Sequence, residues 1–340
     1  MAAVAGRPYL PLMDDPARPF DRRLLRLRRA RAARALRNGS FLHEEIAVRL
    51  LDRLDDIRRP LGRVLDLGSG CPRLVQALRT REGTDFLLRQ DGALALLAGD
   101  GPAVVADEEL LPFGADRFDA VLGIMSLHKV NDLPGTLVQI RHCLKPDGLL
   151  LAAFPGGGTL RELREALLLA ELECLGGATP RVGPFVDLAD AAALLMRAGF
   201  ALPVADRDTI TVHYRDPLHL LADLRAMGET AILAPHLRRP LRREVLARAL
   251  ELYRRRFAAD RGRVRATFEI LFLIGWKPHP DQPRPLPRGS GEVDLAAHLG
   301  RPPGGAQCSR TSGSPGGSKR AANSAQPSSP GARITLRNSK

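Results

Sequence analysis

From Gly62 to Phe154 the chain alternates short, uninterrupted apolar stretches with amphipathic ones, and this alternation constrains the fold more than any other feature. Strands that are apolar throughout are buried on both faces, as in a parallel sheet covered by helices on both sides. The segment therefore predicts a doubly wound α/β fold. Strands are expected in VLDLG, DFLLR, PAVVAD, FDAVLGIM and GLLLAAF, and helices in CPRLVQAL, GALALLA and LPGTLVQIRHCL.

Helical segments flank this alternating region on both sides. Residues 20–36 and 41–54 have apolar residues at helical spacing, so two amphipathic helices are expected before it. After it we expect helices over Thr159–Leu175, Leu188–Ala198, Leu218–Met227 and Arg242–Phe257, and two late strands over Val204–His213 and Arg265–Trp276.

The chain divides by composition into three parts. Residues 1–60 are expected to form a basic helical arm, residues 61–277 the α/β domain with a helical cover within 155–260, and residues 278–340 a tail. The tail is rich in Pro, Gly and Ser, and such a composition buries too little apolar surface to offset the entropy lost on folding. It is therefore predicted to be disordered.

The net charge of +13 is concentrated at the two ends of the chain. Residues 1–40 carry +7 and residues 301–340 carry another +7, which leaves the body between them at −1. Because nucleic-acid binding needs a basic face on the folded body, no specific nucleic-acid partner is expected. The arginines of residues 20–36 fit either a solvated surface helix or an arm that contacts an acidic partner or an anionic membrane.

Neither the cysteines nor the apolar residues indicate a metal centre or a membrane protein. The four cysteines are far apart in sequence and form no CxxC or Cys/His cluster, so no metal ligands and no disulfide framework are expected. No apolar run reaches the roughly 18 residues of a membrane-spanning helix. The first residues also lack the apolar core of a secretory signal. A cytoplasmic location is therefore expected. The early aspartates, which argue against a transit peptide, and the preference for Arg over Lys indicate a bacterial protein.

A glycine-rich loop follows the first predicted strand, in VLDLGSGCPRL. In an open parallel sheet, ligands bind at the carboxyl ends of the strands. Asp66, Gly68 and Gly70 stand at such an end, where glycines allow the backbone to approach a ligand and the next helix offers free N–H groups. Pro72 stands where loops of this kind usually carry another small residue, and proline suits the first turn of a helix.

Three further stretches follow this loop in order: ADEELLPF after the third strand, FDAVLGIMSLHKVND around the fourth, and LKPDGLLL before the fifth. With the loop, they resemble the successive motifs of class I S-adenosylmethionine-dependent methyltransferases. More narrowly, FLHEEIAVRLLDRLDDI, LRAMGE and FEILFLIGWK are similar to the family of the mitochondrial complex I assembly factor described as a protein arginine hydroxylase, with its bacterial relatives. The similarity covers Phe20 to Lys277. It implies a Rossmann-like class I methyltransferase fold, with N-terminal helices and helical additions after the fifth strand.

The resemblance also implies a site for S-adenosylmethionine. The glycine loop would line the methionine end of the cofactor, and Asp107 would accept a hydrogen bond from the adenine amino group. Gln90 takes the aligned place of the acid that binds both ribose hydroxyls, and Asp91 would substitute if the loop shifts by one residue. The expected cofactor-binding residues are thus Asp66, Gly68, Gly70, Gln90, Asp91 and Asp107.

The substrate side of the site is less well defined by sequence. His128 follows the fourth strand and is the candidate catalytic residue, either as a base or as a histidine that binds loop backbone groups. Gly158 stands where the relatives carry an acid, which would pair with a guanidinium. Glu162 and Glu229 are possible replacements for that acid, and Arg73 could supply a cation to the methionine carboxylate.

Three hypotheses on function follow from these residues and from the resemblance. The first is an S-adenosylmethionine-fold enzyme that modifies a protein, with a complex I subunit as the candidate substrate. The second is a methyltransferase that acts on a small or carrier-bound substrate, like the malonyl-carrier methyltransferase of biotin synthesis, a more distant relative. The third is a non-catalytic assembly chaperone, suggested by the departures at Pro72, Gln90 and Gly158.

Overall fold

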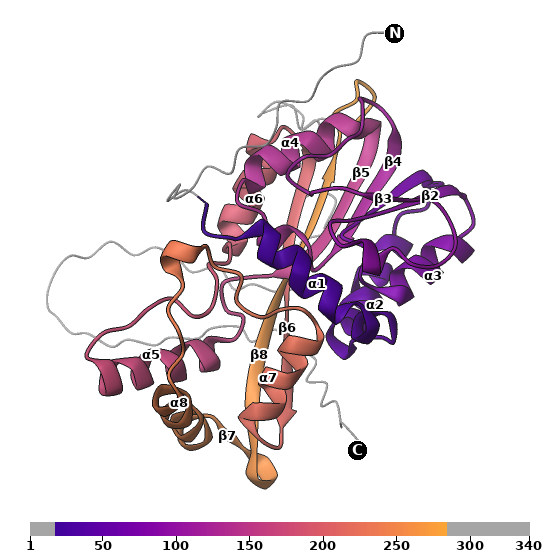
Figure 1. Ribbon diagram of the computed structural model, residues 1–340. Coiled ribbons are helices and arrows are strands. Elements are labelled where there is room, and N and C mark those ends of the chain that lie inside the picture. Colours follow the sequence, from indigo (N-terminus) through magenta and orange to yellow (C-terminus); the bar gives the residue numbers. More distant parts are fainter. Residues whose placement is uncertain (1–17, 284–340) are drawn as a thin grey trace, which may run out of the picture. The chain divides into compact units, whose positions relative to one another are not determined.

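A mixed β-sheet forms the centre of the protein (Figure 1). The computed structural model describes residues 18–283, and those up to Pro280 belong to one compact unit. The strands lie in the order β3-β2-β1-β4-β5-β8-β6, and the short β7 pairs with β8. Their bounds are Gly62–Leu67 (β1), Thr84–Asp91 (β2), Ala103–Val105 (β3), Phe118–Ile124 (β4), Leu144–Pro155 (β5), Ala201–Tyr214 (β6), Ala258–Ala259 (β7) and Arg263–Trp276 (β8).

The direction of the strands confirms the predicted fold class. Strands β1 to β5 pair in parallel, whereas β8 runs antiparallel to both β5 and β6. The first strand lies between β2 and β4, so the chain winds outward from β1 in one direction and then in the other. Such a reversal of strand order leaves a crevice at the carboxyl ends of the strands beside it, which is where ligands bind in doubly wound sheets.

Helices cover both faces of the sheet. Alternate residues of β4 point to opposite sides: Leu122 packs in a cluster with α2, α3, α5, α7 and α8, and Val121 in a cluster with α4 and α6. Figure 1 shows α4 and α6 together on one side of the sheet. The helices are α2 Phe41–Asp55, α3 Pro72–Thr80, α4 Leu133–Cys143, α5 Arg161–Leu175, α6 Leu188–Arg197, α7 Pro217–Ala226 and α8 Arg243–Arg256.

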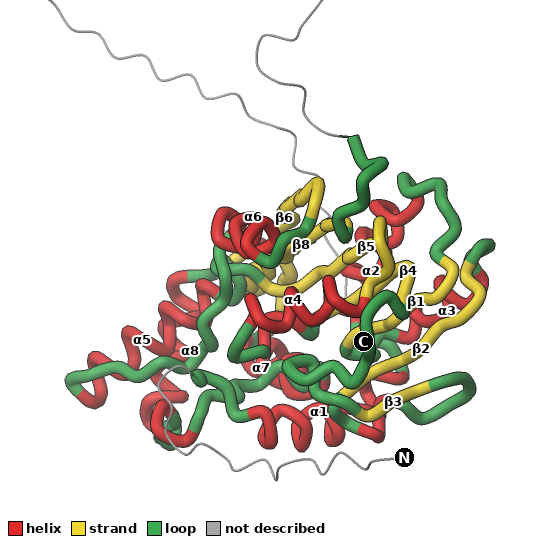
Figure 2. Tube along the Cα trace, turned by 90° about the horizontal axis from the view of Figure 1, so that it is seen from above, coloured by secondary structure: helices red, strands yellow, loops and turns green. Residues whose placement is uncertain are grey.

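The first helix, α1 (Arg22–Arg37), packs against loops of the sheet. Asp21 caps its N-terminus by accepting a hydrogen bond from the backbone N–H of Leu24 at 2.9 Å. Its small apolar residues, Ala32 and Ala33, pack with the 3₁₀ turn Leu94–Leu96 that follows β2. In Figure 2 it runs beside α7, and the two helices are in contact. This position brings α1 to the carboxyl ends of β1 and β2, where Arg29 contacts Gly68 and Asp91.

The expected helix in GALALLA is the one predicted element that the structure does not form. Only the 3₁₀ turn Leu94–Leu96 is present there. Gly99 and Gly101 follow with φ of 109° and 94°, a backbone conformation that glycine adopts readily and that ends a helix. The other strands and helices form where they were predicted, with ends that differ by a few residues.

The predicted division of the chain stays a prediction. Residues 284–340, which include nearly all of the predicted tail, lie outside the described residues, as do residues 1–17. Within the predicted arm, Ile46 and Leu50 of α2 belong to the main core cluster. None of the helices in the described part of the chain combines the length and the apolar surface that a bilayer crossing requires.

Candidate functional site

The glycine loop after β1 lies against the loop after β4. Gly68 has a φ of 72°, and a Cβ atom on it would lie 2.4 Å from the Cβ of Ser126. Glycine is therefore required here by the backbone conformation and by the close approach of the second loop. A Cβ atom on Gly70 would lie 3.1 Å from Nη2 of Arg29, so α1 closes over the same loop.

Gln90 and Asp91, the two candidates for binding a ribose, play different parts at the end of β2. Gln90 is fully buried; its Oε1 accepts from the N–H of Gly68 at 3.2 Å, and its Nε2 donates to the carbonyl of Ala106 at 2.5 Å. Asp91 is also buried and forms an ion pair with Arg29, whose Nε lies 3.1 Å from Oδ2. Gln90 thus joins the glycine loop to the end of β3, and Asp91 is the carboxylate that faces α1.

Asp107 is held in a similar way by the first residue of α1. Nη2 of Arg22 lies 2.5 Å from Oδ1 of Asp107, and the same guanidinium contacts Glu108 and lies 3.6 Å from Oε1 of Glu109. Burial alone would raise the pKa of Asp107, but the hydrogen bond and the charge of Arg22 outweigh it and lower the pKa. Asp107 is therefore an ionised acceptor at neutral pH.

Arg22 and Arg29 are site residues that sequence reasoning missed. They stand seven residues apart, so they lie on the same face of α1, the face that also buries Leu25 and Leu36. That spacing was the available signal, because an arginine in the middle of an apolar helical stripe needs a buried partner. The many arginines of residues 20–36 indicated a solvated surface helix instead, so the spacing of these two was not recognised as a sign of burial.

The Cys-Pro-Arg segment continues the loop into α3. Pro72 is the first residue of that helix, as expected. Arg73 does not face the loop, because its Nε pairs with Oε2 of Glu44 at 2.7 Å and its side chain is half exposed. The guanidinium that contacts the loop belongs to Arg29, whose Nη2 lies 3.4 Å from the carbonyl oxygen of Gly68.

A buried polar cluster lies beside the loop after β4. Nε2 of His128 is 3.0 Å from Oε2 of Glu229, and Nζ of Lys129 contacts the other carboxylate oxygen. Burial would raise the pKa of Glu229, but Lys129 and His128 together lower it below its usual range. Burial lowers the pKa of His128, so its ring is neutral at pH 7. Because an ionised carboxylate only accepts, Nε2 carries the proton and Nδ1 keeps its lone pair.

Several polar atoms around this edge of the sheet are buried without a hydrogen-bond partner. They are Oδ2 of Asp66, Oγ of Ser126, Nδ1 of His128 and both ring nitrogens of His43. Burial raises the pKa of Asp66 to about 7 and lowers that of His43 to about 3. Buried polar groups are almost always paired, and each unpaired one costs about 1–3 kcal/mol. Such a group of unpaired atoms indicates a place that binds a polar ligand or water.

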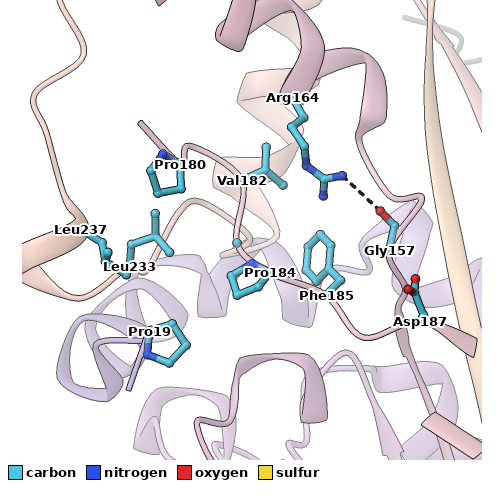
Figure 3. A pocket seen from close by; sticks show the side chains of 11 residues that line it. Pro19, Gly157, Arg164, Pro180, Val182, Pro184, Phe185, Asp187, Leu233 and Leu237 are labelled. Atoms are coloured by element: carbon cyan, nitrogen blue, oxygen red, sulfur yellow. Dashed lines mark hydrogen bonds between the residues drawn. The ribbon is translucent and has the colours of Figure 1, made fainter. Parts of the chain in front are cut away.

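A pocket of about 500 Å³ opens beside Phe185, near this cluster (Figure 3). The ring of Phe185 lines it and also lies 6.0 Å, between centroids, from the ring of His128. Its other apolar walls are Pro19, Pro180, Val182, Pro184, Leu233 and Leu237. The polar lining consists of Gly157, Gly183, Arg164 and Asp187, and Nη1 of Arg164 donates to the carbonyl of Gly157 at 3.2 Å.

The two acids considered as replacements at position 158 have other partners. Glu162 is fully buried, and its carboxylate accepts from both the backbone N–H and the hydroxyl of Thr267. Glu229 belongs to the cluster with His128. The N–H of Gly158 itself donates to Oε1 of Glu269, on β8, at 3.0 Å.

Comparison with known proteins places these residues in a family context. Residues 38–203 match the family model described as a methyltransferase domain. The mitochondrial arginine-hydroxylase NDUFAF5 of Danio rerio is 39% identical over 285 residues, which cover 82% of this chain and 88% of that protein. The human protein of the same name is 40% identical over 298 residues, with coverages of 84% and 86%.

Bacterial methyltransferases are also similar. The malonyl-[acyl-carrier protein] O-methyltransferase of Gallionella capsiferriformans is 30% identical over 276 residues, which cover 77% of this chain and 92% of that protein. The match with this enzyme therefore extends over nearly its whole length, as does the match with the two vertebrate proteins.

Proposed function

The chain belongs to the family of methyltransferase-domain proteins that includes the mitochondrial arginine-hydroxylase NDUFAF5, and on this basis we propose a function for it. It binds S-adenosylmethionine and modifies an arginine side chain of a protein. The observation that carries the proposal is the group of unpaired buried atoms at the ends of β1 and β4, on Asp66, Ser126 and His128. A polar ligand bound there would supply the missing hydrogen bonds.

The chemistry of the side chains fits this cofactor. A ribose needs an acceptor for two hydroxyls, which Asp91 offers at the end of β2, and adenine needs an acceptor for its amino group, which Asp107 offers after β3. The amino acid end of the cofactor needs a carboxylate and a cation; Asp66 lies near the end of β1, just before the glycine loop, and Arg29 contacts the carbonyl of Gly68 in that loop. Gln90 acts indirectly, by fixing Gly68.

When bound, S-adenosylmethionine supplies an electrophilic methyl group on its sulfonium. The chain's own contribution would be to hold the partners in place, which provides most of the acceleration in group transfer. His128 would accept a proton at Nδ1, the nitrogen that has a lone pair and no hydrogen-bond partner among the described residues. Glu229 would fix the ring orientation and tautomer by accepting from Nε2.

An arginine of a protein is the substrate that the similarities favour. The NDUFAF5 proteins are about 40% identical to this chain, against 30% for the malonyl-carrier enzyme. The pocket beside Phe185 is open to solvent and lined by apolar residues, as a site for a peptide side chain needs to be. By analogy with the complex I role of the related family, the protein substrate would be a subunit of complex I. A carrier-bound acyl group is the second candidate, because the bacterial relatives named after that reaction match at nearly full length.

Calorimetry with S-adenosylmethionine tests the cofactor proposal. The full chain should release heat on binding, and D91N and D107N should weaken the affinity by about tenfold or more, since each removes a charged acceptor (about 1.5–3 kcal/mol). R73Q is the control, because Arg73 faces Glu44 rather than the loop. A wild-type chain that binds no cofactor at millimolar concentration would contradict the proposal.

Mass spectrometry of cellular protein separates the substrates. A deletion strain should lose a modification of an arginine in one protein, and the mass lost should equal one oxygen atom if the reaction is hydroxylation or one methylene if it is methylation. If every arginine keeps its mass and malonyl-carrier methyl ester disappears instead, the second candidate is correct.

A further inference from the structure

We propose that Asp187 is the residue that binds the cationic group of the substrate, at the mouth of the pocket beside Phe185. The inference rests on the proposed function, since it concerns the same site, and it names the side chain that selects a guanidinium or ammonium group. Asp187 is the only carboxylate among the described residues that line this pocket. Figure 3 shows it next to Gly157, at the end of the pocket away from Leu237.

The carboxylate of Asp187 is not used by the fold. Asp187 stands at the N-cap of α6, where an aspartate commonly accepts from the helix backbone, but its side chain makes no such hydrogen bond. Within residues 18–283 it also has no ion pair. An exposed carboxylate with no hydrogen-bond or ion-pair partner in this part of the chain therefore faces the pocket.

Of the three glycines after β5, only Gly157 approaches this carboxylate. Gly156, Gly157 and Gly158 have no positive φ, so their backbone conformation is open to any residue. A Cβ atom on Gly157 would lie 2.6 Å from Oδ1 of Asp187, so a larger residue here would push the carboxylate aside. On Gly156 and Gly158 a Cβ atom would lie 2.8 Å and 2.9 Å from the carboxylate oxygens of Glu269. One acid thus approaches the loop at Gly157, and the other supports it by accepting from Gly158.

The wall formed by Phe185 suits a flat cation at the end of a peptide side chain, while Arg164 is the one cation among the described residues of the lining. The ring of Phe185 offers a face on which a guanidinium can stack. Arg164 is held by the carbonyl of Gly157, and its remaining N–H groups can donate to a peptide carbonyl. Phe185 also touches His128, so a side chain anchored at Asp187 would extend along the wall that leads to the proposed base.

Binding of small model compounds to the full chain tests the proposal. The probes are Nα-acetyl-arginine methylamide, the corresponding lysine compound and the citrulline compound, which has the shape of arginine without its charge. Titrations followed by NMR should show the arginine compound binding about three- to fivefold more tightly than the citrulline compound, as expected for one solvent-exposed ion pair. Tighter binding of the lysine compound than of the arginine compound would support the site and assign it to an ammonium group.

The variant D187N should lower the affinity for the arginine compound to that of the citrulline compound. D187S should do the same while it keeps a good N-cap residue, which separates loss of the charge from loss of the helix end. D190N, in the first turn of α6 but outside the pocket, is the matched control and should bind like the wild type. Equal binding of arginine and citrulline compounds, or unchanged binding by D187N and D187S, would overturn the proposal.

The affinity for S-adenosylmethionine, measured on the same samples, should be the same in all variants. If the wild type does not bind S-adenosylmethionine, that result would count against the proposed function alone.

Discussion

At the scale of single residues, the site depends on charges that are buried in pairs. Glu229 illustrates this, because it lies among His128 and Lys129 with its side chain only 10% exposed. Removing one partner of a buried pair leaves the other charge without compensation, which costs about 3–5 kcal/mol. The variant E229Q is therefore expected to lower the free energy of unfolding by about this amount. Urea denaturation followed by circular dichroism would measure it.

Its control is E244Q, since Glu244 is exposed on α8 and, within residues 18–283, pairs only with the exposed Arg242. That variant should change the free energy of unfolding by less than about 1 kcal/mol. If both variants are equally stable, the cluster around Glu229 is not a buried ion pair in solution.

Asp66 leads to a prediction about pH. Burial raises its pKa in the folded protein to about 7, against 3.8 for the unaffected group, although the hydroxyl of Ser69 opposes the shift. The folded state then binds more protons than the unfolded state between these values, so this group lowers stability as pH rises from about 4 to about 7. D66N should be more stable than the wild type at pH 8, by up to about 4 kcal/mol at 1.4 kcal/mol per pKa unit.

Thermal denaturation of both proteins at pH 4, 6 and 8 would measure this. The advantage of D66N should shrink toward pH 4 as the wild-type carboxyl becomes protonated in both states. A difference that is independent of pH would mean that Asp66 titrates normally.

At the scale of elements, α1 sits where the cofactor is proposed to bind. Arg22 and Arg29 form ion pairs with the carboxylates of Asp107 and Asp91, which are the proposed acceptors for the adenine amino group and the ribose hydroxyls. The cofactor and α1 would then compete for the same oxygens. We therefore expect R22Q to bind S-adenosylmethionine about three- to tenfold more tightly than the wild type, the factor that corresponds to about 0.7–1.4 kcal/mol. Calorimetry at pH 7.5 would measure the change.

R31Q is the matched control for this variant, because Arg31 is exposed on the same helix and has no carboxylate partner among the described residues. It should leave the affinity unchanged. Weaker binding by R22Q would instead show that Arg22 orients Asp107 for the cofactor.

The elements also show which part of the structure the sequence could reveal. The strands from β1 to β5 were predictable, because a run such as VLDLG is apolar on both faces and admits few other environments. The stretch GALALLA was equally apolar, but it forms only one 3₁₀ turn before Gly99, which has a positive φ. Asp107 could be proposed as a site residue from its place after β3. Gln90 and Asp91 could be told apart only in the structure, where Gln90 accepts from the glycine loop and Asp91 pairs with Arg29 of α1.

At the scale of the whole molecule, the N-terminal helix and the sheet are joined by contacts between residues far apart in sequence. The pair Arg22–Asp107 links segments 85 residues apart. Helical period alone could place both arginines on one face of α1, but no local pattern shows which acid each one meets. Contacts of this kind depend on the complete tertiary structure, which is why the arm was predicted as a helix without its function in the site.

The same pair gives a test of how α1 is held to the sheet. Both side chains are largely buried, so a double-mutant cycle with R22Q, D107N and the double variant should give a coupling free energy of about 1–3 kcal/mol at pH 7. The pKa of Asp107 is lowered in the folded state, so this stabilisation is present above the pKa of the unfolded chain and is lost as pH falls through the folded value. Urea titrations at pH 7 and at a series of pH values below the ordinary pKa of an aspartate should therefore show the coupling at pH 7 and its decrease as the pH falls. A coupling near zero at pH 7 would mean that the Arg22–Asp107 pair does not hold α1 to the sheet, and that its other contacts, such as the Arg29–Asp91 pair, do so.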